Sequence, residues 1–218
     1  MRNDHVDTGP DTPEQSAAAP GYRRSAGSPR GQARRQELLE LVTADIAEQG
    51  LVGFSLRRAA KAAGTTHKVL LYHFPSAEDL LREAVERLRA RRVDRGLAAG
   101  RAAPTSLAER VRAIWPLLSG PDEGARALDQ ALGLAMYDPE RHGSLALDAT
   151  SSILPALRAL CPADWEERRR QEVAELILAA LRGLLVQRRI GGPQDTGEAG
   201  LAALLRMLER EEAAGERG

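Results

Sequence analysis

The residues from Thr66 to His73 concentrate side chains that can hydrogen-bond to phosphates and to the edges of nucleotide bases. Lys68 suits a phosphate or a guanine, and Tyr72 offers its ring to a thymine methyl and its hydroxyl to a phosphate. His67 and Lys68 fall in the first turn of an expected helix, whose positive end also attracts phosphate. Thr66 caps that helix, and His73 is expected to donate to a phosphate. The segment therefore predicts a helix that lies against DNA.

Other roles for these side chains stay open from the sequence alone. Tyr72 and His73 can instead pack between neighbouring helices, and His67 can be an ordinary solvated residue. His67 and His73 are six residues apart and do not share a helix face, so a metal pair is not expected there. We expect neither a bound metal nor a cofactor in this chain.

Two short helices are expected to position this segment. Ser55 is a suitable N-cap for a helix through Ala63, and Gly64 ends that helix because glycine adopts the left-handed C′ conformation freely. Thr66 begins the next helix, which Pro75 ends. Small alanines on the first helix let the second cross it closely. This order of elements predicts a helix-turn-helix, whose second helix enters the major groove.

The rest of the chain has helical periodicity and no convincing period-2 strand pattern. A helix is expected from Ala33 until Gly50, and Ser76 with Asp79 forms a capping-box-like start of another. We expect Pro155 to kink or divide a later helix. The later helices are expected over residues 106–118, 122–137, 144–160, 163–190 and 196–212.

The predicted fold class is all-α, with an N-terminal three-helix helix-turn-helix domain followed by a helical ligand-binding and dimerisation domain. Residues 1–32 are rich in Pro, Gly, Ser and Ala and predict a disordered tail, because they offer little apolar surface to bury. The DNA-binding domain is expected over residues 33–76 and the regulatory and dimerisation domain over residues 77–213. Residues 214–218 are expected to be disordered.

Composition restricts where the chain acts and how it meets DNA. The 218 residues hold 31 Lys and Arg against 31 Asp and Glu, so attraction to DNA must come from a local surface. The single cysteine excludes a disulfide within the chain and fits a reducing compartment. No apolar run is long enough to span a bilayer, and the N-terminal region lacks the apolar core of a secretory signal. A cytoplasmic location without membrane contact is expected.

The stretch FSLRRAAKAAGTTHKVLLYHFPSAEDLL resembles the tetracycline-repressor (TetR) family of bacterial transcription regulators. The resemblance at the level of motifs covers about Arg34 to Val85. It implies a sequence-specific regulator that binds a pseudo-palindromic DNA operator as a homodimer. In this family a small-molecule effector generally binds the second domain and releases a repressor from DNA. The residue types match that pattern at Phe54, Ala59, Ala60, Ala63, Gly64, Thr66, Leu70, Tyr72, His73, Phe74 and Leu80.

Three positions depart from the family pattern. The family often has Ser or Thr at Val69, Tyr at Leu71 and Lys at Ala77, and the apolar replacements remove three phosphate partners. Arg57, Arg58 or the Arg34 and Arg35 pair can compensate for them. Arg57 completes the expected DNA-binding set with Thr66, His67, Lys68, Tyr72 and His73. The departures also support an alternative function, a helical dimer whose degenerate head leaves it as a ligand-binding or protein-interaction module.

The last two long helices are expected to form the dimer interface. The segment from Val173 to Val186 is apolar nearly all round, so its helix needs partners on two sides. Members of the resembled family pair their last two helices into a four-helix bundle. The expected interface residues are Leu176, Leu181, Gly183, Leu184, Leu201, Leu204, Leu205 and Leu208. A monomeric helical core is the alternative.

An effector cavity is expected in the second domain. Trp115, Met136 and Tyr137 are adaptable or amphipathic side chains that could line it, and either Arg126 or Asp129 could anchor a polar group. Aromatic residues are rare in this chain, so the lining is expected to be mostly Leu, Ala and Val. Such a lining favours a largely apolar effector.

Enzymatic activity is not expected. The sequence contains no Gly-x-Ser-x-Gly elbow, phosphate-binding Gly loop, Cys-x-x-Cys or His-Glu-x-x-His motif. Cys161 and His142 could be considered as a nucleophile and base, but Cys161 precedes Pro162 at a helix boundary and reads as a structural thiol.

Overall fold

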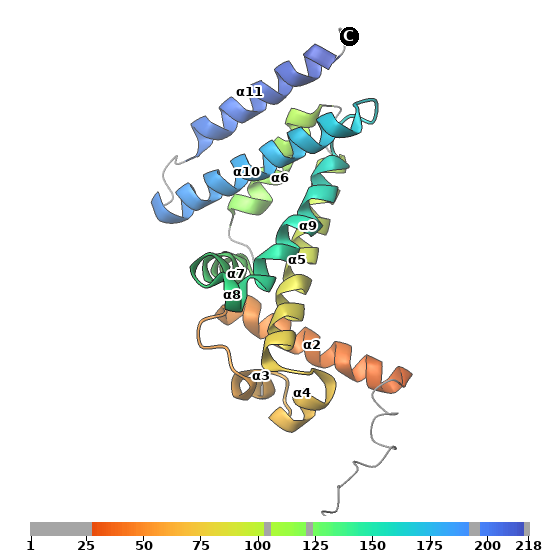
Figure 1. The fold of residues 1–218 in the computed structure, drawn as a ribbon, viewed down its shortest axis with the longest axis vertical. Coiled ribbons are helices and arrows are strands. Elements are labelled where there is room, and N and C mark those ends of the chain that lie inside the picture. Colours follow the sequence, from red (N-terminus) through yellow and green to blue (C-terminus); the bar gives the residue numbers. More distant parts are fainter. Residues whose placement is uncertain (1–27, 103–105, 121–123, 192–196, 216–218) are drawn as a thin grey trace, which may run out of the picture.

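The computed structural model describes residues 28–102, 106–120, 124–191 and 197–215, and every regular element in these ranges is a helix (Figure 1). The all-α class predicted from periodicity is confirmed for this part of the chain. None of the described helices combines the length and the apolar character that a membrane span requires. The helices are α2 (Pro29–Gln49), α3 (Leu56–Ala62), α4 (His67–His73), α5 (Ala77–Ala102), α6 (Leu107–Ser119), α7 (Ala125–Tyr137), α8 (Pro139–His142), α9 (Ser144–Arg158), α10 (Glu167–Gly191) and α11 (Glu198–Gly215).

Helix α2 begins earlier than the apolar pattern indicates. The Ser28 hydroxyl accepts a hydrogen bond from the Gly31 amide at 3.1 Å, and Pro29 occupies the first turn, where its missing N–H costs nothing. Residues 29–32 are therefore helical and do not belong to a disordered tail. Residues 1–27, the rest of the expected tail, lie outside the described residues. The start signal was present in the Ser-Pro pair, but the amphipathic stripe begins only later in the helix.

Other helix boundaries also differ from the pattern. Pro155 lies inside α9, which stays one helix, and Pro116 lies inside α6. The short helix α8 was not predicted, and α11 continues to Gly215, two residues into the segment expected to be disordered. Residues 216–218 lie outside the described part of the chain. In α10, the first helical residue is Glu167 and not Ala163.

Two apolar cores share the long helix α5. The first core, formed by α2, α3, α4, the first half of α5 and one face of α7, has Leu38, Leu70 and Phe74 at its centre. The second core is formed by α6, the end of α9, α10 and α11. Figure 1 shows α5 rising from the α2–α4 group toward α6 and α9. The helix-turn-helix domain expected over residues 33–76 is called the head below. Since the first core includes Ala127 and Ala131 of α7, the packing of the head extends well beyond residue 76.

Candidate nucleic-acid interface

The predicted helix-turn-helix is formed by α3 and α4. The Ser55 hydroxyl caps α3 by accepting from the Arg58 amide at 3.2 Å. Gly64 has φ 58°, the left-handed conformation that lets the chain leave α3 at little cost. The Thr66 hydroxyl then accepts from the Val69 amide at 3.4 Å and caps α4. Both caps and the glycine turn are encoded locally, which is why the sequence predicts them.

The two faces of α4 have opposite characters. Leu70 and, just beyond the last helical residue, Phe74 are 0% exposed within the head, as the sequence predicts. His67, Lys68 and Leu71 are exposed, and Lys68 lies on the side of the helix opposite Leu70. The helix is therefore fixed by its inner side chains and presents a basic first turn to solvent. Its N-terminal end adds a partial positive charge there.

Tyr72 and His73 lie partly buried at the end of α4. Their rings meet edge to face, with centroids 4.9 Å apart. Burial lowers the pKa of His73, and the nearby positive charges of Arg34 and Arg35 lower it further. A neutral imidazole is a weaker phosphate partner than a charged one, because it lacks the electrostatic attraction. The geometry thus fits the packing role for His73 better than the expected donation to phosphate.

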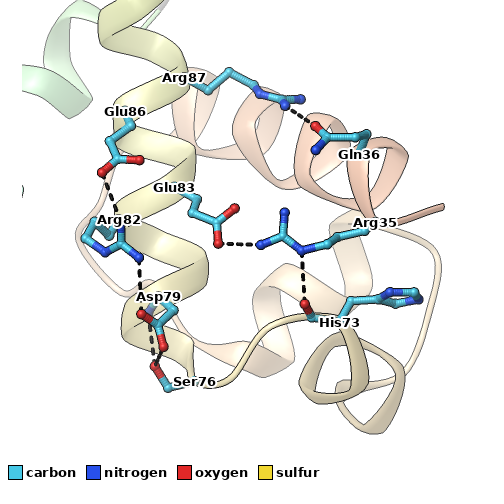
Figure 2. Close-up of polar contacts among 9 residues, drawn as sticks. All are labelled: Arg35, Gln36, His73, Ser76, Asp79, Arg82, Glu83, Glu86 and Arg87. Carbon is cyan, nitrogen blue, oxygen red and sulfur yellow. Dashed lines mark hydrogen bonds and ion pairs between the residues drawn. The ribbon is translucent and has the colours of Figure 1, made fainter. Parts of the chain in front are cut away.

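Arg35 joins three helices of the head (Figure 2). Its Nε donates to the His73 carbonyl oxygen at 3.1 Å, and its Nη2 lies 2.5 Å from Glu83 Oε1 on α5. The guanidinium also lies 4.6 Å from the centroid of the Phe74 ring. These contacts hold the end of α4 between α2 and α5. Arg35 is committed to this structural position and does not supply the compensating phosphate contact considered from the sequence.

Arg58 has a similar structural position between α2 and α3. Its Nε donates to Asp45 Oδ2 at 2.8 Å, and its Nη2 donates to the Gly50 carbonyl oxygen at 3.0 Å. Arg34 pairs with Glu37 at 2.7 Å on the exposed surface of α2. Of the four arginines considered as substitutes for the missing phosphate partners, Arg57 is exposed and belongs to no ion pair that the described residues show.

One exposed cation was missed by the sequence reasoning. Lys61 follows Arg57 by four residues on α3, so both project from one face of that helix. Together with Lys68 they are the exposed cations of α3 and α4, and these three residues are called the basic face of the head below. The spacing of Arg57 and Lys61 was the available signal.

The remaining groups considered for chemistry are accounted for by packing. Cys161 is buried, and burial raises the pKa of its thiol, which disfavours the reactive thiolate. Its Sγ lies 3.6 Å from the Leu157 carbonyl oxygen. Among the described residues there is no group of three or more His, Cys, Asp or Glu side chains that could hold a metal ion.

Most residues expected at a dimer interface lie inside the chain's own second core. Five of them are at most 5% exposed in the single chain: Leu181, Leu201, Leu204, Leu205 and Leu208. Leu184 packs partly against the same core. Leu176 is 45% exposed, and Gly183 faces open space. Close approach of α10 and α11 instead depends on Gly200, where a Cβ would lie 2.6 Å from Leu184 Cδ2.

A cavity of about 340 Å³ lies among α5, α6, α7, α9 and α10, and both apolar cores contribute to its lining. Of the five residues expected to bind an effector, Asp129 and Met136 line it. Trp115 belongs to the second core and its Nε1 donates to Glu198 at 3.3 Å. Arg126 donates to the Glu48 carbonyl oxygen at 2.8 Å, and Tyr137 is 90% exposed. Periodicity identified the helices but not the faces that meet at the cavity.

The arrangement of a buried support helix and an exposed, capped second helix is that of a helix-turn-helix DNA-binding protein. Residues 43–84 match the sequence model of the bacterial regulatory proteins, tetR family. Over these residues, from the second half of α2 into α5, the chain is similar to this family of DNA-binding transcriptional regulators.

Individual relatives agree with this assignment. The HTH-type transcriptional regulator BetI of Rhizobium meliloti (strain 1021) is 29% identical over 177 residues, which cover 78% of this chain and 84% of that protein. The multidrug binding protein EbrR complexed with proflavin has the same fold, with a TM-score of 0.58 and 23% identity over 79% of this chain and 98% of that one. A transcriptional regulator from Rhodococcus sp. Rha1 has a TM-score of 0.57 and 23% identity, covering 81% of this chain and 96% of that structure.

Proposed function

We propose that this protein is a homodimeric transcriptional repressor that leaves its operator when a small, largely apolar effector enters the second domain. The observation that carries the proposal is the division of α4 into a buried face and an exposed, basic first turn. A rigidly mounted helix of this kind can place side chains against base edges without first ordering itself.

The DNA contacts follow from the exposed surface of the head. Lys68 and His67 lie at the N-terminal end of α4, and Thr66 adjoins them. Tyr72 follows one turn later on the same face, and Arg57 extends the surface along α3. His73 is retained in the proposed set as a residue that orients Tyr72 through their ring contact. The proposal adds Lys61 as a phosphate contact that completes the basic face.

Dimerisation is supported by an apolar stripe that no described side chain covers. Leu176, Ala179, Gly183, Val186 and Ile190 are exposed and recur every three or four residues along α10. Met207 of α11 is also exposed, at 53%. Exposed stripes with this spacing pack against a second helix pair in a bundle. A two-fold dimer also presents two recognition helices to half-sites about one helical turn, ~34 Å, apart.

Helix α7 connects the effector cavity to the head. Leu132 and Met136 line the cavity from one side of α7. On its other side, Gln130 Oε1 accepts from the Leu51 amide at 2.7 Å, and Arg126 donates to the Glu48 carbonyl oxygen. These contacts hold the end of α2 and the start of the α2–α3 loop. An occupant that displaces α7 therefore moves the head, which changes the spacing of the two recognition helices in a dimer.

The first test is a fluorescence-anisotropy titration of the full chain against the duplex upstream of its own gene, with a scrambled duplex as control. Saturable binding about 10³-fold tighter than the control supports a sequence-specific regulator. Equal, weak and salt-sensitive binding to both duplexes reflects phosphate attraction only.

The alternative of a degenerate head is favoured by one feature, the exposed Leu71 on the outward face of α4. If a screen of genomic fragments also shows no specific duplex while the dimer is intact, the repressor function is refuted in favour of that alternative. The restoring variant Leu71→Tyr would then be expected to recover affinity, since it returns a hydroxyl to the face.

A further inference from the structure

Helix α4 has three consecutive apolar side chains, and one of them stays exposed. Leu70 is 0% exposed in the first core, and Val69 is partly buried against the same core. Leu71 belongs to neither apolar core of the described chain and is 44% exposed. Single exposed apolar side chains are common on protein surfaces, so exposure alone assigns no role to Leu71. Its place on the helix that the proposed function brings to DNA restricts the groups that it can meet.

Leu71 lies beside the polar residues proposed to contact DNA. It follows Lys68 by three residues and His67 by four, the two spacings at which side chains on a helix are neighbours, and both residues are exposed. Leu71 lies about 4.5 Å beyond Lys68 along the helix axis, at 1.5 Å per residue. Base pairs of B-DNA are about 3.4 Å apart. When Lys68 reaches one base pair, Leu71 therefore faces the same base pair or a close neighbour.

The chemistry of the major groove restricts the partner of such a side chain. A leucine side chain has no hydrogen-bond donor or acceptor, so it forms no hydrogen bond with a phosphate or with the polar groups of a base edge. The C5-methyl group of thymine is the apolar group that base pairs present in the major groove. Contact between the two removes apolar surface of both from water, which is favourable. Against the polar edge of another base, the same leucine would displace water without replacing its hydrogen bonds.

We propose that Leu71 is a specificity-determining residue that recognises a thymine in each half-site of the operator through its C5-methyl group. The contacted thymine lies within about two base pairs of the position that Lys68 reaches. The inference rests on the proposed function of α4 as the recognition helix of a homodimer.

Tyr72 is less well placed for the same contact. From the sequence, its ring is expected to meet a thymine methyl group. In the structure Tyr72 is partly buried, and its ring meets the His73 ring edge to face. Leu71 is the more exposed of the two neighbours. The apolar contact is therefore assigned to Leu71.

The probe is the operator with deoxyuridine in place of thymidine, a change that removes the methyl group and keeps the base pairing. Selection from a pool of random duplexes with the full chain provides the operator, so no target gene has to be known. Each thymine is then replaced in turn, in one half-site and in both, and affinity is measured by fluorescence anisotropy. At the contacted position we expect an affinity about fourfold lower for one half-site and roughly 15-fold lower for both. An affinity that no replacement lowers overturns the proposal.

A variant identifies the side chain that meets the methyl group. Leu71→Ala should bind the thymine operator more weakly and should no longer distinguish it from the deoxyuridine operator. Leu41→Ala is the matched control, because Leu41 on α2 is 39% exposed and also belongs to neither core. It should show the same loss on deoxyuridine as the parent chain. If Leu71→Ala keeps that loss, another residue contacts the methyl group and the assignment to Leu71 is wrong.

The inference and the proposed function fail in different ways. The deoxyuridine measurement uses the parent chain and does not depend on the folding of a variant. If selection with the folded dimer yields no specific duplex, the repressor function fails and the inference fails with it. If selection yields an operator whose affinity does not depend on any thymine methyl group, the DNA-binding function stands and the role of Leu71 is refuted.

Discussion

Lys68 and Arg35 are both basic residues of the head, but their surroundings give them different roles. Lys68 is exposed in the first turn of α4, beside the positive end of the helix. Arg35 is held by the His73 carbonyl oxygen, Glu83 and the Phe74 ring. If a cation whose donors are engaged within the chain turned to a phosphate, the chain would lose those hydrogen bonds and ion pairs. Residue type alone therefore does not identify a DNA contact.

Lys68→Ala is expected to weaken operator binding by about 1–3 kcal/mol if Lys68 reads a base, with specificity relaxed at one position. If it contacts a phosphate, the loss is uniform across sequences and the salt slope falls by about 1. Anisotropy titrations at several salt concentrations distinguish the two cases. Arg168→Ala, on the exposed surface of α10, is the control and should bind like the parent. Unchanged affinity for Lys68→Ala would refute its role.

The partly buried position of His73 predicts a pH dependence of stability. Its pKa is lowered in the folded chain from an ordinary value of 6.5, so the unfolded chain binds more protons as the pH falls below that value. The contribution of His73 to the free energy of unfolding should therefore be fully present above pH 6.5 and be lost as the pH falls through the lowered pKa. Urea denaturation between about pH 8 and pH 5 should show a shallower decline for His73→Gln. Parallel declines would contradict this cause.

At the scale of elements, α7 is the helix that contributes both to the DNA-binding head and to the effector cavity. It contributes Ala127 and Ala131 to the core of the head and Leu132 and Met136 to the cavity. Its contacts with the end of α2 are hydrogen bonds to single backbone groups. One of these groups, the Leu51 amide, is buried with its residue and has the Gln130 amide oxygen as partner. Such a partner is costly to remove because the donor stays buried.

Gln130→Leu is expected to lower the free energy of unfolding by about 1–3 kcal/mol, since the Leu51 N–H loses its acceptor. It should also reduce the effect of a bound effector on DNA affinity, because α7 then holds the head less firmly. Chemical denaturation and an effector titration of the DNA complex measure the two effects. Gln187→Leu makes the same replacement at an exposed position of α10. A stability loss of equal size in Gln187→Leu would argue against the hydrogen bond as the cause.

At the scale of the whole molecule, the single chain buries most of its long apolar helices and leaves one surface of α10 and α11 uncovered. The predicted stripe on α11 is used inside the chain, where Leu208 is 1% exposed. Leu176 of α10 and Met207 of α11 stay exposed. A second copy that covers this surface would position two heads at once, which a monomer cannot do.

Met207→Glu is expected to shift the protein from dimer to monomer, because it places a charge in the proposed interface without disturbing the core. Leu176→Glu should act in the same way from α10. Light scattering after size-exclusion chromatography measures the mass, and operator affinity should fall with it. Val52→Glu, which introduces the same charge on the 76% exposed Val52 of the head, should leave the mass unchanged. A dimeric Met207→Glu variant would place the interface elsewhere.

The local signals in the sequence determined the helices and the motif that joins them. Ser55, Gly64 and Thr66 act through bonds and backbone angles of their nearest neighbours, so each could be read without knowledge of the fold. The same holds for the burial of Leu70 and Phe74, which periodicity predicts correctly. The identity of the DNA-contacting residues stays a prediction, drawn from the resemblance and from exposure.

The tertiary structure alone decided which partner each surface meets. An apolar stripe indicates that a helix face is covered but not what covers it. The stripe of α11 was therefore assigned to a second chain, although residues of its own chain cover it. The sequence likewise gives the charge of an arginine but not the group that it pairs with. Arg35 and Arg58 were therefore considered as possible DNA contacts, although both are held by groups of their own chain. The cavity arises where five helices from separate parts of the chain converge, so its lining depends on how these helices face one another. Local sequence specifies the conformation of each helix, whereas contacts between distant residues depend on the packing of the whole chain.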